Sequence, residues 1–369
     1  MNYDFATYLT QQFQPTEQTI KRRIQIETQK LSRTRAESEK KRIIAEELIS
    51  FVNVVAAGDM RLMDTIMSIF QMKYPYYKEG IRQAWQDNAT KSMIDSTKMD
   101  LFFDISATEK RLNKMMPKLP RFSWYISLPV RMSKPFTSKD DREMHVLDNP
   151  ICREWILGMP MIRPSTWKGN LRWTARIKSL DQDVLERLFG NESNEKVFHR
   201  GRLSFFPTFF DHINFEVITP LNRETRTPKT GPILMECVHH HPDDNLTAGE
   251  FNLLYLAPIS SRSKEDEVIR HVAVDLIHTT EILTEMLLSY GFSAKKTSGF
   301  GVVEDNFCNK CGQKLGVLAL TDVPFNEVES IESEGDLSKY KIECKSFGNC
   351  AEMCQHAKQM AKALEVSCP

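Results

Sequence analysis

The chain has 369 residues, of which 41% are hydrophobic and 27% are charged, an ordinary composition for a soluble globular protein. This length allows two or three domains, each with its own core. Lysine and arginine together number 49, as do aspartate and glutamate, so the formal net charge is zero. That balance excludes a protein that binds nucleic acid through its overall charge, and any such contact needs a local basic face.

The N-terminal residues lack the charged start and apolar core of a secretory signal. No apolar run approaches the roughly 20 residues needed to span a bilayer. We therefore expect a cytoplasmic protein with no membrane contact. Five of the eight cysteines lie between Cys308 and Cys354, and in a reducing compartment such clustering favours metal binding over disulfides.

Residues 1–118 are predicted to form a helical extension, because apolar residues recur there at helical spacing. The run at 21–42 is rich in Arg, Lys, Glu and Gln, which is typical of a solvated helix with charge pairs four residues apart. A helix that lies along RNA or a neighbouring subunit is the alternative. The two apolar series consist of Ile44, Leu48, Val52 and Val55, and of Met63, Ile66, Met67 and Phe70.

Residues 119–304 are predicted to form an α+β core. Strand-like runs occupy 121–132, 201–210, 213–220, 231–238 and 251–259, and an amphipathic helix occupies about 264–290. Strands interrupted by helices favour a ferredoxin-like, RRM-like arrangement, with helices packed against one antiparallel sheet. Residues 305–369 are predicted to form a separate small, cysteine-rich unit.

The segment 147–172, LDNPICREWILGMPMIRPSTWKGNLR, combines an Asp-bearing loop with a helix that is expected to begin near Ser165. Ser165 and Thr166 are suitable N-cap residues, and the free amides of a first helical turn can bind an anion. Lys168 and Arg172 would share one helix face. Gly169 removes a side chain where a phosphate backbone could approach closely. From these residues alone, a purely structural capped helix remains the alternative.

The same segment resembles the signature of the repeat-associated (RAMP) superfamily, specifically the backbone subunits of type III CRISPR effector complexes. A glycine-rich loop that these proteins lay against the guide RNA is similar to TSGFGVV, which contains Gly299 and Gly301. The resemblance covers roughly residues 121–303. The residues that match the two-part signature are Asp148, Pro150, Ile151 and Arg153, followed by Pro160, Ile162, Ser165, Lys168, Gly169, Leu171 and Arg172, with Thr166 in place of a second serine.

The resemblance implies a subunit that binds guide RNA (crRNA), a paired target RNA and other CRISPR effector subunits. It implies that Ser165, Thr166, Lys168, Gly169, Arg172 and the two loop glycines contact RNA. It also implies that Asp148 cuts target RNA with Mg²⁺ or Mn²⁺, because a carboxylate can hold the ion near a phosphate. A turn formed by Asp-Asn-Pro is the structural alternative.

Two other interpretations of the RAMP resemblance remain open. One is a purely architectural subunit that does not cut RNA. The other is a metal-independent guide-processing ribonuclease, for which His199 or His212 would be the acid–base group. Asp140 and Asp141 lie in the same long loop as Asp148, either as assisting metal ligands or as solvated turn residues.

The cysteine-rich segment predicts a structural Zn²⁺ site. Cys308 and Cys311 have the two-residue spacer that lets both thiolates face one ion, and Gly312 permits the tight turn. The preferred ligands are completed by Cys344 and Cys350. Cys354 is a close competitor of Cys344, and buried or free thiols are the alternative to zinc. A third possible function is a zinc-ribbon adaptor in which residues 305–369 carry the activity.

Overall fold

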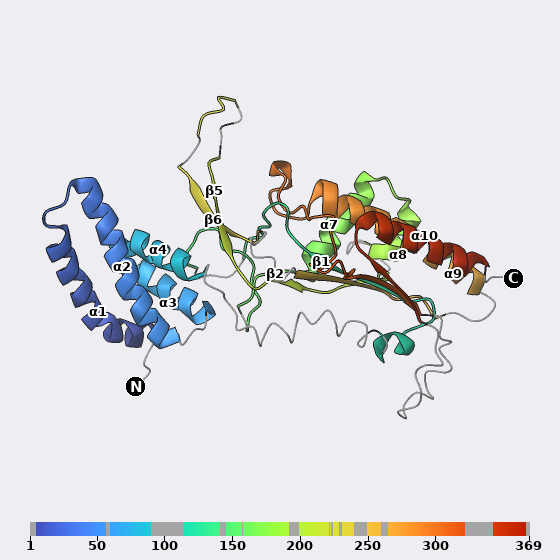
Figure 1. Cartoon of the computed structure of the whole chain (residues 1–369), viewed down its shortest axis with the longest axis horizontal. Coiled ribbons are helices and arrows are strands. Elements are labelled where there is room, and N and C mark those ends of the chain that lie inside the picture. Colours follow the sequence, from blue (N-terminus) through green and yellow to red (C-terminus); the bar gives the residue numbers. More distant parts are fainter. Residues whose placement is uncertain are drawn as a thin grey trace. The chain divides into compact units, whose positions relative to one another are not determined.

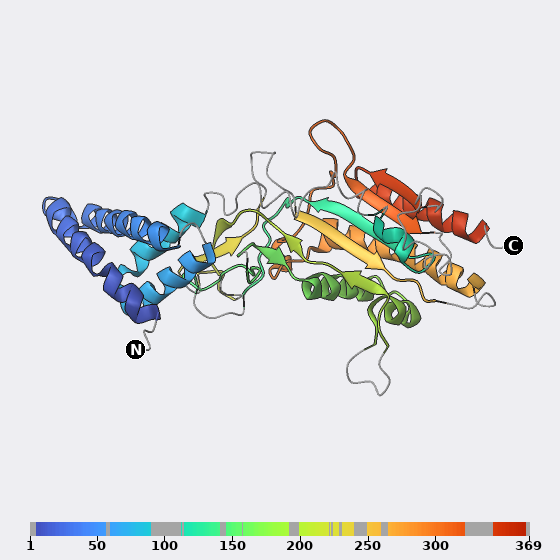
Figure 2. The same ribbon diagram turned by 90° about the horizontal axis from the view of Figure 1, so that it is seen from below.

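The computed structural model describes residues 5–56, 60–89, 112, 114–140, 145–156, 158–191, 199–220, 222, 224–228, 231–239, 249–259, 265–321 and 342–366. The chain divides into two compact units, each assembled from three stretches of sequence (Figures 1 and 2). We call them the helical unit (Met1–Asp95, Thr137–Met161 and Asp211–Val238) and the sheet unit (Ser96–Phe136, Ile162–Phe210 and His239–Pro369). Each unit therefore combines segments that the sequence-based boundaries place in different domains.

Helices dominate the first stretch of the helical unit, as the periodicity predicts. They are α1 (Phe5–Thr28), α2 (Arg33–Ala56), α3 (Met60–Lys73), the short 3₁₀ helix η1 (Pro75–Tyr77) and α4 (Lys78–Ala89). The predicted apolar series are buried except for Val55, which is half-buried. The rings of Phe13 and Phe70 stack with centroids 4.4 Å apart, which joins α1 to α3. Burial of these faces supplies most of the stability of such helices.

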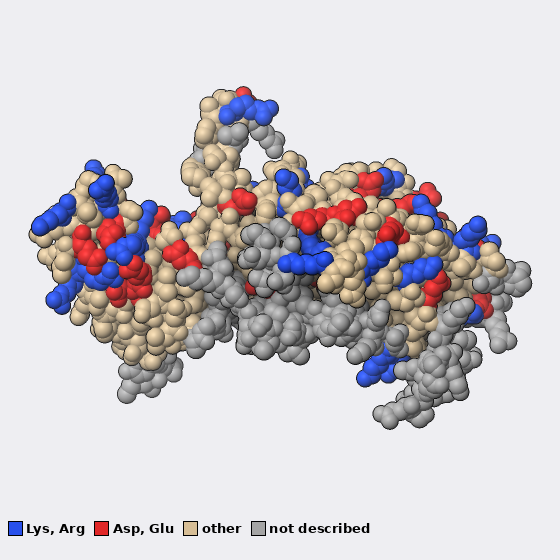
Figure 3. All heavy atoms as spheres, viewed as in Figure 1, with Lys and Arg blue, Asp and Glu red and all other residues tan. Residues whose placement is uncertain are grey.

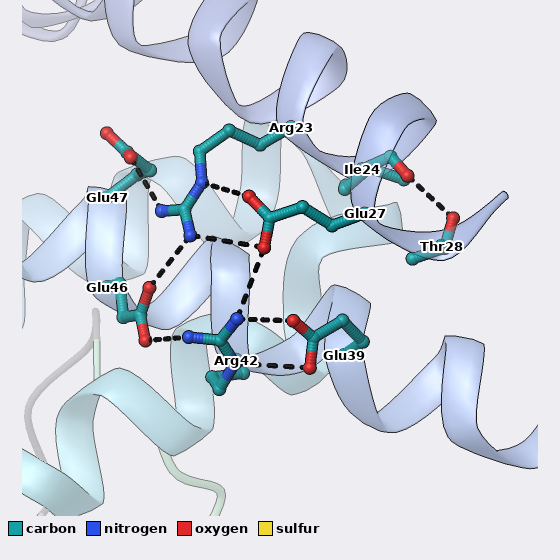
Figure 4. A network of polar contacts seen from close by, with 8 residues as sticks. All are labelled: Arg23, Ile24, Glu27, Thr28, Glu39, Arg42, Glu46 and Glu47. Carbon is teal, nitrogen blue, oxygen red and sulfur yellow. Dashed lines mark hydrogen bonds and ion pairs between the residues drawn. The ribbon is translucent and has the colours of Figure 1, made fainter. Parts of the chain in front are cut away.

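The charged run at 21–42 forms a network of ion pairs between α1 and α2 (Figure 4). Arg23 binds Glu27, Glu46 and Glu47, and Arg42 binds Glu27, Glu39 and Glu46. These groups are partly exposed, so each pair contributes little to stability. The network confirms the expected charge pairing, and it neutralises Arg23 and Arg42 within the protein.

The helical unit also contains the loop 137–161 and the antiparallel hairpin of β5 (Asn214–Ile218) and β6 (Ile233–Cys237). Arg153, a residue of this loop, holds the helices, the loop and the hairpin together. It is only 3% exposed, and its guanidinium binds Asp64 of α3 at 2.9 Å and Glu236 of β6 at 2.5 Å. Its guanidinium also lies 5.0 Å from the ring centre of Trp85 on α4.

The partners of Arg153 make further bonds to the loop. Glu236 accepts hydrogen bonds from the indole of Trp85 at 2.7 Å and from the amide of Ile151 at 2.9 Å. Asp64 accepts from the amide of Val146 at 3.0 Å and pairs with His145 at 2.7 Å. Burial raises the pKa of Asp64, but hydrogen bonding by His145 and the charge of Arg153 outweigh it and hold this pKa below its ordinary value.

The sheet unit contains a five-stranded antiparallel sheet in the order β3-β7-β1-β8-β9. Figure 1 shows helices α7 to α10 on one side of it. This arrangement confirms the α+β prediction. The strands of the sheet are β1 (Trp124–Val130), β3 (Leu203–Phe205), β7 (Gly249–Tyr255), β8 (Gly316–Thr321) and β9 (Ile342–Phe347), and two short strands, β2 (Met161–Ile162) and β4 (Thr208–Phe209), lie outside it.

The helices of the sheet unit include the long helix expected at 264–290, which is α9 (Glu265–Glu285) continued by the π-helical turn η4 (Met286–Tyr290). On the opposite face of the sheet, Met116 of η2 packs against Val317 and Ala319 of β8. The other helices are α7 (Pro164–Ile177), α8 (Gln182–Phe189), α10 (Cys350–Val366) and the 3₁₀ turns η2 (Met116–Lys118) and η5 (Lys296–Ser298).

The described part of 305–369 continues this sheet instead of forming a unit of its own. β8 pairs with β1 and β9 pairs with β8, while α10 packs along α9. All six residues of β8 are buried, as expected for a strand covered on both faces. No helix in the described ranges is both long and apolar enough to cross a membrane.

A buried carboxylate connects the helices to the sheet. Asp275 of α9 is fully buried and accepts hydrogen bonds from Arg187 of α8 at 2.8 Å, from the hydroxyl of Tyr255 at 2.8 Å and from Arg202 at 3.4 Å. Burial and the charge of Asp275 raise the pKa of Tyr255.

We expect Arg153→Ala to lower the free energy of unfolding by about 3–5 kcal/mol, because it leaves two buried carboxylates without their cation. Urea denaturation followed by circular dichroism measures the change. Arg33→Ala, which removes an exposed arginine of α2, is the matched control. Equal stability of the two variants would show that Arg153 does not anchor the loop.

Asp275→Ala is expected to destabilise the chain by a similar amount, about 3–5 kcal/mol, because Arg187 and Arg202 lose the acceptor between them. The control is Asp266→Ala, at an exposed position in the first turn of the same helix. Thermal unfolding of the two variants gives the comparison, and a midpoint unchanged by Asp275→Ala would contradict the assignment.

Candidate nucleic-acid interface

Helix α7 begins at Pro164, one residue before the predicted start. Arg163 is the N-cap residue, and no side chain caps the first turn. The prediction that Ser165 and Thr166 cap this helix is therefore wrong. Proline has no amide hydrogen and a fixed φ, so it suits the first helical position and moves both hydroxyl residues inside the first turn.

The outer face of α7 carries the residues that the sequence singles out for RNA contact. Ser165 and Gly169 are exposed, and Lys168 and Arg172 are half-buried beside them. A Cβ atom added to Gly169 would meet no atom within 4 Å, so space is open above the helix backbone there. The structure thus confirms that these four residues share one accessible face, which we call the α7 face.

The opposite side of α7 fixes the helix to the sheet unit. Trp167 packs against Phe251 and Phe292, with ring centroids 4.8 and 4.4 Å apart, and its indole donates a hydrogen bond to Thr208 at 3.0 Å. Leu171 is also fully buried. Packing of this side leaves the α7 face with little freedom to move.

Positive charge accumulates at the α7 face. Burial lowers the pKa of Lys168, and repulsion by Arg172 and by Arg200 lowers it further. Among the residues that the structure describes, no carboxylate forms an ion pair with Lys168 or Arg200. A group of cations that repel one another favours binding of an anion such as a phosphate.

The glycine-rich loop lies directly beside α7. Gly299 and Gly301 have φ values of +79° and +82°, and a Cβ atom on Gly301 would stand 2.4 Å from the amide nitrogen of Ser293. Both positions therefore favour glycine for structural reasons. The structure brings this loop and the predicted helix together, as an RNA-binding surface requires.

Three residues that the sequence reasoning did not select for RNA contact belong to the same surface. Lys296, directly before the glycine-rich loop, binds Asn170 at 2.9 Å, and its ammonium lies 3.8 Å from the ring centre of Trp173. Trp173 follows Gly169 by one helical turn and is 40% exposed, so helical spacing could have identified it. Arg200 could not be found in this way, because only the fold brings it near Lys168.

On the side of the molecule visible in Figure 3, lysine and arginine are interspersed with aspartate and glutamate. No single basic field covers that side, as the zero net charge of the chain leads one to expect. The α7 face is therefore a local concentration of positive charge and not part of a general one.

The predicted catalytic residue, Asp148, belongs to the loop of the helical unit. Its side chain is 75% exposed and forms an ion pair with Arg82 of α4 at 2.8 Å. The loop residues around it are held by the bonds to Arg153, Glu236 and Asp64 described above. Asp148 is thus an exposed carboxylate on an anchored loop, accessible to an incoming phosphate or ion.

Asp140 is not a solvated turn residue. It is 1% exposed and accepts a hydrogen bond from the amide of Arg153 at 3.3 Å. A buried carboxylate with a backbone donor has a structural role in this loop. Asp141 lies outside the described residues.

The predicted metal ligands do not form a cluster within the described part of the chain, where no three His, Cys, Asp or Glu side chains could together hold an ion. Cys308, Cys311 and Gly312 do form the expected turn, with Gly312 at φ +77°. Cys311 and Cys344 are exposed, whereas Cys350 is buried, and burial raises the pKa of its thiol. The described cysteines are therefore not gathered into one four-cysteine cluster.

Comparison with solved structures finds low similarity. A chain of the type III-B Cmr-beta complex bound to cognate target RNA has 15% identity and a TM-score of 0.40, over 77% of this chain and 94% of that one. A chain of a CRISPR RNA-guided surveillance complex has 12% identity and a TM-score of 0.32, over 67% and 85%. Oligomeric Cmr4 from Pyrococcus furiosus has 14% identity and a TM-score of 0.26, over 49% and 95%.

No curated protein matches the chain. A family model does match, and it covers β1, α7, the long helix α9 and the glycine-rich loop. That model is the RAMP superfamily, and the segment of the chain that it matches, residues 124–304, belongs to that superfamily.

Proposed function

We propose that this protein binds guide RNA along the α7 face as a backbone subunit of a type III CRISPR effector complex. The observation that carries the proposal is the α7 face itself, where Lys168 and Arg172 flank the open space above Gly169. Membership of the RAMP superfamily and the two-part signature in 147–172 support it. A ferredoxin-like RAMP core is part of the same proposal.

Binding of this kind is directed to the phosphate backbone and not to the bases. Arginine and lysine side chains and the free amides of a first helical turn hold phosphates in any sequence. A chain with zero net charge can bind RNA in this way because only the local charge faces the ligand. Other subunits of the complex and a target RNA paired to the guide are the further partners of this proposal.

Cleavage of the target RNA at Asp148 is a second part of the proposal. Its exposed carboxylate can receive an ion, and a bound Mg²⁺ or Mn²⁺ would activate a nucleophile and stabilise the charge that develops on the phosphate. Because Asp148 belongs to no group of three His, Cys, Asp or Glu side chains in the described part of the chain, RNA oxygens would have to complete the coordination. The alternative is an architectural subunit in which the Asp148–Arg82 ion pair serves only the loop.

We expect Lys168→Ala combined with Arg172→Ala to weaken binding of single-stranded RNA about tenfold at physiological ionic strength, whatever the sequence. The slope of log affinity against log salt should fall by about 0.7 for each lost phosphate contact. Fluorescence anisotropy of the full chain with labelled RNA at several salt concentrations measures both. The control is Lys358→Ala on α10, which removes an exposed lysine paired with Glu281.

The glycine on this face separates RNA binding from folding. Gly169→Ala fits the open space and should stabilise the helix by about 1 kcal/mol, yet it should weaken RNA binding if the phosphate backbone approaches there. Unchanged affinity in both the charge variant and Gly169→Ala would rule out the α7 face as the RNA-binding surface.

Asp148→Ala and Asp148→Asn are expected to abolish cutting of guide-paired target RNA in the reconstituted complex with Mg²⁺ or Mn²⁺, while target binding persists. The matched control is Asp183→Ala, an exposed carboxylate in the first turn of α8. Undiminished cutting by both Asp148 variants would assign the protein an architectural role.

A metal-independent ribonuclease remains the competing function. His212 pairs with Asp211 at 2.5 Å, and His199 lines a cavity together with Lys168 and Arg200. Cleavage of a repeat RNA in EDTA by the isolated chain would favour this function over the proposed one. Structural Zn²⁺ at Cys308, Cys311, Cys344 and Cys350 stays a prediction.

A further inference from the structure

The sheet unit contains a cavity of about 410 Å³ between the start of α7, the end of α8 and β3. Lys168, His199 and Arg200 line it with nitrogen-bearing side chains, and Phe189 and Phe205 line it with aromatic rings. This volume is within the range of pockets for small organic ligands. Its lining combines the two features that a nucleotide needs, namely cations for a phosphate and rings for a base.

The backbone of the cavity is fixed by close contacts. Helix α8 ends at Gly190 with φ +80°, and the chain returns beside it through a bridge between Gly190 and Arg200. A Cβ atom on Gly201 would lie 2.3 Å from the carbonyl carbon of Phe189. The side chain of Asn191 accepts a hydrogen bond from the amide of His199 at 2.8 Å. The cavity is therefore largely preformed.

The charged part of the cavity is suited to a phosphate. Lys168 and Arg200 are close enough for the second cation to lower the pKa of the first. In the part of the chain that is described, neither cation has a carboxylate partner. Binding a phosphate between them would relieve their mutual repulsion.

The aromatic part of the cavity is suited to a base. The rings of Phe189 and Phe205 are nearly parallel, at 14°, with centroids 6.5 Å apart. Phe189 is 1% exposed and belongs to the core, whereas Phe205 is half-buried and lines the cavity. A half-exposed ring of this kind is the usual platform for an unstacked base of RNA.

We infer that this cavity binds a single nucleotide, with the phosphate held by Lys168 and Arg200 and the base stacked on Phe205. The nucleotide has two possible sources, an unstacked residue of the RNA on the α7 face or a free mononucleotide. For the first source the inference rests on the proposed function, since Lys168 belongs to both surfaces. For the second source it stands independently.

The experiment compares the full chain with Arg200→Gln and Phe205→Leu, which keep much of the original side-chain volume. The matched control is Phe206→Leu, the neighbouring ring, which is exposed and does not line the cavity. Binding of AMP is measured by calorimetry, and binding of single-stranded RNA by fluorescence anisotropy. Circular dichroism and thermal unfolding establish that each variant is folded.

Arg200→Gln and Phe205→Leu should each weaken nucleotide binding about tenfold, the usual effect of losing one phosphate contact or one base stack. Phe206→Leu should have no effect. Weaker RNA binding in both variants supports a nucleotide of the bound RNA. Weaker AMP binding with unchanged RNA binding supports a free mononucleotide.

Cavity variants that match the wild type with both ligands would overturn the inference. The proposed function is judged separately. If RNA binding survives both the loss of the positive charges at Lys168 and Arg172 and Gly169→Ala, the α7 face is ruled out as the RNA-binding surface, while the AMP measurement still decides whether the cavity holds a nucleotide.

Discussion

The helical unit depends on one buried cation. The guanidinium of Arg153 is almost inaccessible to solvent, and its charge is balanced by Asp64 from α3 and Glu236 from β6. Burial of three charged groups is favourable only when they satisfy one another, so the position of each element is coupled to that of the others. The loop that carries Asp148 lies within this arrangement, because Ile151 and Val146 donate their amides to the same two carboxylates.

This coupling gives the RAMP signature two different roles. Arg153 belongs to the motif by which the sequence resembles RNA-binding proteins, but its side chain is buried in an ion-pair network and not presented to a ligand. Asp148 is five residues earlier in the same motif and is exposed. Its ion pair with Arg82 lies at the surface, where such pairs contribute little and exchange readily for water or another charge. The buried pairs therefore hold the loop, and the exposed pair leaves its carboxylate available.

The basic side chains of the two units have different surroundings. In the helical unit, Arg23 and Arg42 are each surrounded by glutamates, so the charges of these two guanidiniums are balanced within the protein. In the sheet unit, Lys168 is surrounded by other cations and its pKa is lowered. Equal numbers of acidic and basic residues over the whole chain thus permit ion pairs in one unit and a local cluster of cations in the other. Such a cluster is where an anionic ligand gains most from binding.

Many of the helices and strands, and much of the α7 face, can be predicted from the amino-acid sequence alone. The periodic spacing of apolar residues identified the helix with Ile44, Leu48 and Val52 and the long helix α9, because this spacing is a local property of the chain. The same local spacing placed Lys168, Gly169 and Arg172 on one face. It did not locate the start of α7, since the effect of Pro164 outweighed the capping preference of Ser165 and Thr166.

Contacts between residues far apart in the sequence depend on how the folded chain packs. Asp64 and Glu236 are 89 and 83 residues from Arg153, and no pattern in the sequence links them. The return of the chain at Gly201 brings Arg200 to Lys168, and the pairing of β8 with β1 places the cysteine-bearing segment at the sheet. Such contacts follow from how buried faces pack together, which spacing along the chain does not encode.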